Sequence, residues 1–114
     1  NHSFLASFNQ NSVNNWPVER IVLTIFDAQN PNPDLTCIDC VGELGMTDLI
    51  THYSQCDALL FLSEAESYGL PLVEAMHLGK PIICVDLPYS RELCGDLPFY
   101  FNLILISTCY KKFF

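Results

Sequence analysis

Half of the 114 residues are hydrophobic and 16% are charged, which provides enough apolar side chains for the core of one domain and excludes a disordered tail. The 13 acidic and 5 basic residues give a net charge of -8, and the basic residues are scattered along the sequence. Such a chain is repelled by duplex nucleic acid and by anionic membrane surfaces, so we expect no nucleic-acid partner.

The first half of the sequence predicts two strands, a helix and a third strand. Residues 1–19 are rich in asparagine and show no hydrophobic period, so we expect an irregular lead-in. The β-branched run 20–26 predicts a buried strand, and residues 36–41 predict a second, weaker one. Residues 46–55 place apolar side chains at i, i+3, i+4 and i+7, which is typical of an amphipathic helix. The short apolar run 57–62 predicts a strand that is buried on both faces.

The second half continues the alternation. Pro71 and Gly79 delimit a predicted helix over 71–78, because proline is favoured at the first helical position and glycine just past the last one. The remaining predicted elements are a buried strand at 81–86, a short helix within 87–95 that is capped by Ser90, and a last strand at 98–101. Strands that alternate with short helices indicate the α/β class, with a Rossmann-like parallel sheet and flanking helices.

The loop 63–70 predicts an anion-binding site. It leaves the carboxyl end of a predicted strand, which is where open parallel sheets bind ligands. Gly69 allows backbone to approach a ligand closely, and Pro71 lacks an N–H, which we expect to leave the N–H groups of Leu72 and Val73 pointing outwards. A helix start carries partial positive charge and binds anions. A diphosphate is therefore the predicted ligand.

Two carboxylates flank this predicted anion site. We expect Glu74 in the first turn of an otherwise apolar helix, where a buried carboxylate is unfavourable unless its oxygens are hydrogen-bonded. A ribose diol would satisfy both oxygens, and Glu66 on the loop could serve a sugar beyond the diphosphate in the same way. A simpler explanation stays open, because the helix macrodipole alone favours an acid in the first turn and Glu66 can be a solvated loop charge.

The stretch EAESYGLPLVEAMHLGKPII, residues 64–83, closely resembles the E-x7-E signature of the retaining glycosyltransferases of family 4, which have the two-domain GT-B architecture. The likeness extends over about residues 36–102. It implies transfer of a sugar, with retention, from a nucleotide-diphosphate donor. It also implies that Glu66, the catalytic residue, holds the donor sugar and that Glu74 holds the nucleotide ribose. The donor-binding residues implied by the resemblance are Glu66, Ser67, Tyr68, Gly69, Leu70 and Glu74. It also implies that backbone N–H groups near Tyr68 to Leu70 and at the helix start meet the diphosphate and the sugar.

The same resemblance implies that neither a metal nor another cofactor is required, and that the acceptor is an unidentified glycan, lipid or small molecule. We expect residues 20–102 to form a partial donor-binding domain, half of a GT-B architecture, followed by an atypical, truncated or divergent tail at 103–114. The family's acceptor-binding amino-terminal domain is missing from this sequence, so we expect a fragment that is inactive alone. The alternative is a non-catalytic α/β domain that binds a nucleotide or a partner, with idle motif residues.

Several other reactive residues favour structural roles. His77 lies three residues after Glu74 on the same predicted helix. A packed or partly exposed histidine is a simpler interpretation than a general base. Asp86 and Ser90 lie in a second loop at the sheet edge. Two roles stay open for them: a structural turn with a helix cap, or contact with the donor. The six cysteines lack zinc-site spacing, and we expect them to be reduced. Reduced cysteines and the lack of an export signal predict a cytoplasmic location, at the inner face of a membrane if the acceptor is a lipid.

Overall fold

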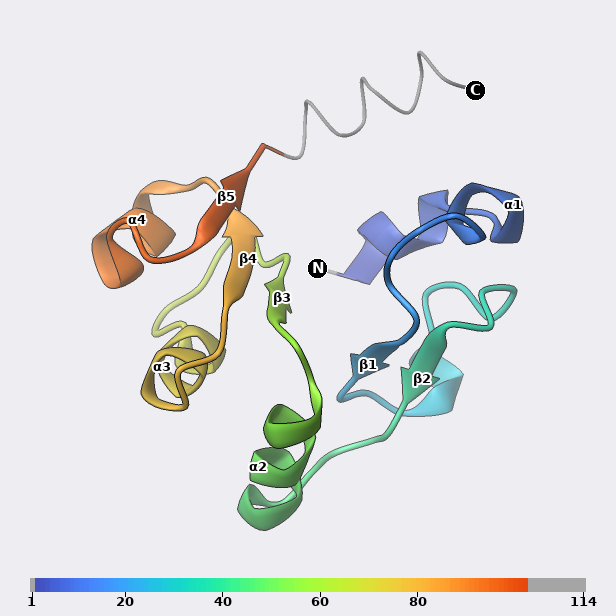
Figure 1. Cartoon of the computed structure of the whole chain (residues 1–114), viewed down its shortest axis with the longest axis horizontal. Helices are drawn as coiled ribbons and strands as arrows, with labels where there is room; N and C mark the ends of the chain where they lie inside the picture. The colour runs from blue at the N-terminus through green and yellow to red at the C-terminus, as the bar shows by residue number, and fades with distance from the viewer. Residues whose placement is uncertain (1, 103–114) are drawn as a thin grey trace. The chain divides into compact units, whose positions relative to one another are not determined.

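The computed structural model describes residues 2–102 (Figure 1). It divides into two compact units, residues 1–50 and 51–114. Short helices alternate with parallel strands in both units, so the predicted α/β class with parallel strands and flanking helices is confirmed. The predicted tail at 103–114 lies outside the described residues.

The lead-in of the first unit is more regular than its sequence suggested. It forms a 3-10 helix, η1 (His2–Ser7), and one helical turn, α1 (Gln10–Val13). Asn9 and Ser12 form a capping box, in which the Ser12 N–H donates to Asn9 Oδ1 at 2.9 Å. The Phe8 ring lies 4.8 Å from the Trp16 ring, centroid to centroid. Hydrogen bonding at the short helix and aromatic packing therefore order a stretch that has no hydrophobic period.

Two short parallel strands complete the first unit. They are β1 (Ile21–Leu23) and β2 (Ile38–Cys40), paired from Ile21 opposite Ile38, with the 3-10 helix η2 (Asp27–Gln29) between them. Both strands are shorter than predicted, and Leu23 is the one residue of these two strands that is buried. Asn32 is also buried, and its side-chain amide donates to the backbone oxygens of Leu5 at 2.9 Å and Phe8 at 2.7 Å. This amide therefore ties the loop before β2 to the lead-in.

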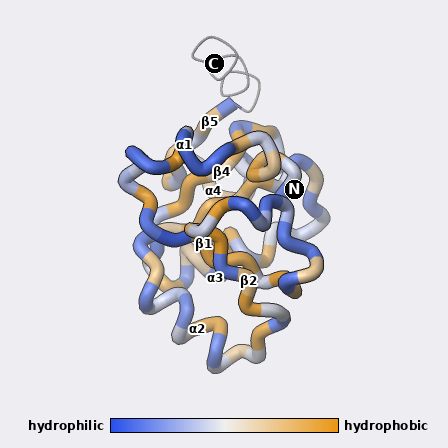
Figure 2. Tube along the Cα trace, turned by 90° about the vertical axis from the view of Figure 1, so that its right-hand side faces the viewer, coloured by the Kyte–Doolittle hydropathy of each residue, from blue (hydrophilic) through white to orange (hydrophobic). Residues whose placement is uncertain are grey.

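The helix α2 (Met46–Gln55) has the predicted bounds. Hydrophobic and hydrophilic residues are interspersed along it, as the hydropathy colours of Figure 2 show. Of its predicted apolar face, however, Tyr53 alone is buried, whereas Met46 is 68% exposed and Ile50 is 47% exposed. The helix therefore contributes one anchoring side chain rather than a continuous apolar stripe.

The second unit is a three-stranded parallel sheet with order β3-β4-β5. Its elements after α2 are β3 (Leu59–Phe61), α3 (Leu70–His77), β4 (Ile82–Val85), α4 (Pro88–Cys94) and β5 (Phe99–Phe101). Leu72, Ala75 and Cys84 are completely buried where α3 packs against β3 and β4. In Figure 1 α3 and α4 lie on the same side of this sheet. The predicted βαβαβ order is confirmed.

The predicted burial of the strand at 57–62 on both faces is wrong, and the strand predicted as buried at 81–86 is also exposed on one face. Leu60, Ile83 and Phe99 lie side by side in the strand register, and they are 41%, 38% and 71% exposed. The physical reason is that both helices of the unit cover the opposite face. Successive parallel strands joined by crossovers of one hand place their helices on one side of the sheet.

The described residues contain no disulfide: Cys37, Cys40, Cys56, Cys84 and Cys94 are free thiols. Cys40 is the last residue of β2. Within residues 2–102 we find no helix with the length and apolar character needed to cross a bilayer.

Candidate functional site

An open pocket of about 260 Å³ lies between α4 and the loop that joins β3 to α3. The loop follows the carboxyl end of β3, and α4 follows the carboxyl end of β4, so the pocket lies at the edge of the sheet where the sequence predicted a ligand. Its lining residues are Glu66, Ser67, Tyr68 and Gly69 from the loop, and Tyr89, Glu92 and Leu93 from α4.

Gly69 brings the two walls of the pocket together. Its backbone is left-handed, with φ 61 and ψ 41, a conformation that disfavours residues with a Cβ. A Cβ at this position would lie 2.9 Å from Leu93 Cδ2, which is closer than van der Waals contact. The sequence suggested that this glycine allows a ligand to approach. The structure adds that its conformation and its proximity to Leu93 of α4 both favour glycine.

The free amide groups lie one step earlier than predicted. The N–H groups of Leu72 and Val73 do not point outwards, because both donate to the Gly69 oxygen, at 3.0 and 3.2 Å. The helix starts at Leu70, so Pro71 is its second residue. Within residues 2–102 the amides of Tyr68, Gly69 and Leu70 have no hydrogen-bond acceptor. These three amides are therefore the donors that an anion would meet at the start of α3.

Glu74 is the fifth residue of α3, so its predicted place in the first turn is wrong. The macrodipole acts mainly within the first turn and does not explain this acid. Glu74 is half-buried, and its Oε2 accepts a hydrogen bond of 3.3 Å from the hydroxyl of Tyr53 on α2. Burial, followed by the negative charge of Glu74, raises the pKa of Tyr53 to about 12.

Tyr53 was not selected as a site residue from the sequence. It was read as one of four apolar positions of an amphipathic helix, yet it is the one member of that face with a hydroxyl group. That hydroxyl also lies 3.3 Å from the Pro71 oxygen, so it contacts the start of α3 as well as Glu74. The other carboxylate oxygen of Glu74, Oε1, has no donor in the described part of the chain.

The pocket brings together four of the six predicted donor-binding residues. Leu70 is 63% exposed and lies outside the pocket lining, as does Glu74. Sequence reasoning missed the whole wall formed by α4. The spacing of Tyr89, Glu92 and Leu93, at i, i+3 and i+4, was the available signal, because such residues share one face of a helix.

The second loop at the sheet edge has a structural role. Asp86 forms a two-bond ion pair with Arg91, at 2.8 and 2.9 Å, and this contact lowers the pKa of the Asp86 carboxyl. Ser90 is fully buried and hydrogen-bonds to the Val85 oxygen at 2.8 Å. Ser90 lies inside the first turn of α4, and its hydroxyl oxygen accepts a hydrogen bond of 3.2 Å from the Leu87 N–H. It therefore stabilises the start of the helix, although Leu87 and not Ser90 is the N-cap residue.

Residues 37–98, more than half of the chain, match the family described as "Glycosyl transferases group 1". The chain belongs to this family. All seven pocket residues, and Tyr53 and Glu74, lie within the matched part of this group 1 glycosyltransferase chain.

Curated relatives of the group 1 glycosyltransferase chain transfer sugars by name. The chain is 38% identical over 87 residues to the serotype-specific mannosyltransferase WbdA of Escherichia coli, covering 76% of this chain and 10% of that protein. It is 33% identical over 60 residues to the O-antigen chain mannosyltransferase RfbU of Salmonella typhimurium, covering 53% of this chain and 17% of that protein. The chain thus spans at most a fifth of the length of these relatives. No solved structure matches it.

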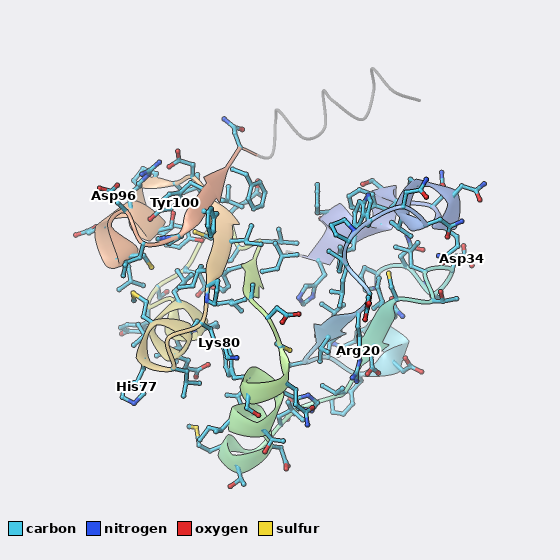
Figure 3. All side chains as sticks on the ribbon, viewed as in Figure 1. Arg20, Asp34, His77, Lys80, Asp96 and Tyr100 are labelled. Carbon is cyan, nitrogen blue, oxygen red and sulfur yellow. The ribbon has the colours of Figure 1, made fainter. Side chains whose placement is uncertain are left out.

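The three basic residues within the described part of this group 1 glycosyltransferase chain all have partners, and none of them lines the pocket. Arg20 pairs with Asp39, and Lys80 Nζ donates to the Cys56 oxygen at 2.9 Å. Arg91 is held by Asp86 and lies 3.8 Å above the ring of Tyr100, which is labelled in Figure 3. Residues 2–102 contain no group of three or more His, Cys, Asp or Glu side chains that could hold a metal ion. Beside the pocket, the backbone amides of Tyr68, Gly69 and Leu70 can donate hydrogen bonds to an anion.

Proposed function

We propose that this chain is the donor-binding part of a retaining glycosyltransferase of family 4, with the E-x7-E pair Glu66 and Glu74. The observation that carries the proposal is the pocket at the sheet edge, where Glu66 lies beside three amides that have no acceptor in the described residues. Amides without acceptors bind anions, and an adjacent carboxylate accepts hydrogen bonds from hydroxyl groups. A nucleotide-diphosphate sugar presents both kinds of group side by side.

The pocket has the size of one sugar ring rather than of a whole donor. Its volume is about 260 Å³, whereas pockets for drug-sized ligands are on the order of 300 to 1,000 Å³. We assign the donor sugar to the pocket, with Glu66 accepting hydrogen bonds from its hydroxyl groups. We assign the diphosphate to the amides of Tyr68, Gly69 and Leu70. These amides, and not a metal ion or another cofactor, are the proposed ligands of its negative charge.

Glu74 is assigned to the ribose of the nucleotide. It lies four residues beyond Leu70 on the same helix, which corresponds to about 6 Å along the helix axis. A ribose lies on the far side of the diphosphate from the sugar, so a carboxylate outside the sugar pocket is the expected arrangement. Tyr53 holds Oε2 of this carboxylate, which fixes its direction and leaves Oε1 for a ribose hydroxyl.

In the proposed reaction, the bond between the anomeric carbon and the diphosphate oxygen breaks, and the acceptor hydroxyl oxygen bonds to the same face of that carbon. The hydroxyl proton passes to the departing diphosphate. Glu66 acts as the catalytic residue by holding the sugar hydroxyls while positive charge develops on the ring. The acceptor is a glycan, a lipid or a small molecule. The name of one relative, the O-antigen chain mannosyltransferase RfbU, supports an O-antigen chain as the acceptor. We assign the binding of the acceptor to a separate amino-terminal domain.

A non-catalytic nucleotide- or partner-binding domain is the second candidate. The observation in its favour is the hydrogen bond from Tyr53, which gives Glu74 a partner within the fold. A carboxylate that serves the fold in this way does not need a ligand to account for it. The two candidates therefore differ in whether Glu66 and Glu74 contribute to binding of a donor.

Calorimetric titration of the full chain with the diphosphate sugars of uridine, guanosine and adenosine separates these candidates. We expect one of them to bind, and we expect Glu66→Ala and Glu74→Ala each to weaken that binding by about tenfold or more, because each removes a charged hydrogen-bond acceptor. Glu64→Ala is the matched control, because Glu64 is exposed on the same loop and does not line the pocket. A chain that is folded by circular dichroism and binds none of the three supports the second candidate.

A further inference from the structure

The α4 wall of the pocket is fixed to the loop in two places. Tyr89 is half-buried, and its hydroxyl donates to the Ser63 oxygen, so its ring is held between α4 and the loop. Leu93 Cδ2 lies close to Gly69, where an added Cβ would come within 2.9 Å of it. Both contacts join residues of α4 to the segment that follows β3. They therefore fix the backbone of the third lining residue of α4, Glu92, across the pocket from the loop.

The pocket has two carboxylates and no positive charge. Glu66 comes from the loop and Glu92 from α4, and none of the lining residues is basic. Arg91 precedes Glu92 but contacts Asp86 and Asp96, with its guanidinium over Tyr100. The lining also includes Tyr68 and Tyr89. The faces of their rings can pack against the C–H groups of a sugar, and their hydroxyl groups can form hydrogen bonds.

We propose that Glu92 is a specificity-determining residue that disfavours acidic sugars in the pocket. A carboxylate accepts hydrogen bonds only, so it favours hydroxyl groups and repels a second carboxylate. With Glu66 on one wall and Glu92 on the other, a uronic acid would bring a third negative charge into the pocket. This inference rests on the proposed donor site and narrows the donor to sugars without an acidic group.

The test compares donors that differ only at the sugar C6 group. Uridine diphosphate glucose and uridine diphosphate glucuronic acid form one such pair, and guanosine diphosphate mannose and guanosine diphosphate mannuronic acid form another. Calorimetric titration of the full chain is expected to show roughly tenfold tighter binding of the neutral member of the pair that binds, because one unit charge is repelled at close range in partly screened surroundings. Glu92→Gln keeps a hydrogen-bonding group of similar size and should reduce this preference at least threefold. Glu64→Gln, which makes the same charge change outside the pocket, should leave it unchanged.

The outcomes distinguish the role of Glu92 from the existence of the donor site. A reduced preference in Glu92→Gln with an unchanged preference in Glu64→Gln supports the role of Glu92. Equal binding of the neutral and acidic sugars, or a preference that Glu92→Gln does not change, overturns that role and leaves the donor site intact. If a folded chain binds the diphosphate sugars of neither pair nor those of adenosine, the donor site itself is wrong, and the role of Glu92 with it.

Discussion

Replacing Gly69 with alanine tests whether the loop and α4 form the pocket as one packed unit. The left-handed backbone at this position disfavours a residue with a Cβ by about 1 to 2 kcal/mol. The new Cβ would also lie 2.9 Å from Leu93 Cδ2, and moving Leu93 away from its preferred rotamer adds about 0.5 to 1.5 kcal/mol. We therefore expect Gly69→Ala to lower the free energy of unfolding by about 1.5 to 3.5 kcal/mol.

Gly79→Ala is the matched control for this substitution. Gly79 has a similar φ of 65, and a Cβ there would meet no atom within 4 Å, so we expect a loss of only about 1 to 2 kcal/mol. Urea unfolding followed by far-UV circular dichroism measures both values. Gly69→Ala should thus lose more stability than Gly79→Ala, and we call this difference the excess. In the double variant with Leu93→Ala the excess should disappear, once the effect of Leu93→Ala alone has been subtracted. The reasoning is refuted if Gly69→Ala costs no more than Gly79→Ala, or if the excess persists without the Leu93 side chain.

Two further substitutions test contacts that surround the site. Tyr53→Phe should lower the free energy of unfolding by about 1 kcal/mol, because the ring stays buried while the bond to Glu74 is lost. The raised pKa of Tyr53, about 12, means that the unfolded chain ionises first as the pH rises. Wild-type stability should therefore fall between about pH 10 and 12, by at most about 3 kcal/mol, and urea titrations of Tyr53→Phe should lack this pH-dependent loss. Ser90→Ala should cost about 1 to 3 kcal/mol in the same assay, since it leaves the Leu87 N–H without its acceptor; a loss below about 0.5 kcal/mol would contradict this role.

The order of strands and helices in the second unit was predictable because each element has a strong local signal. The apolar runs give β3 and β4, and Gly79 ends α3 with a left-handed backbone and two closing bonds, Gly79 N–H to Met76 and Lys80 N–H to Ala75. The lead-in was less predictable, since its order comes from side-chain contacts such as Asn32 to the backbone of Leu5. The hydrophobic periodicity of a sequence does not predict contacts of that kind.

The position of the pocket was predictable, but only one of its walls was. The loop residues from Glu66 to Gly69 are adjacent in sequence and follow a strand, so general rules for parallel sheets identify them. Glu92 and Leu93 reach the pocket through the packing of α4 on Gly69, which is a tertiary contact. The amides of Leu72 and Val73 were wrongly predicted to be free for a related reason. A shift of the helix start by one residue decides which N–H groups find an acceptor, and sequence patterns locate helix ends less accurately than that.

Binding at the amide cluster is the central claim, and it can be observed directly. Amide chemical shifts of the ¹⁵N-labelled full chain should be recorded while the nucleotide-diphosphate sugar that binds best in calorimetry is added. The account predicts that the largest changes occur at Tyr68, Gly69 and Leu70, with smaller changes near Glu74. Saturable shifts confined to other parts of the chain, with these amides unmoved, would contradict it.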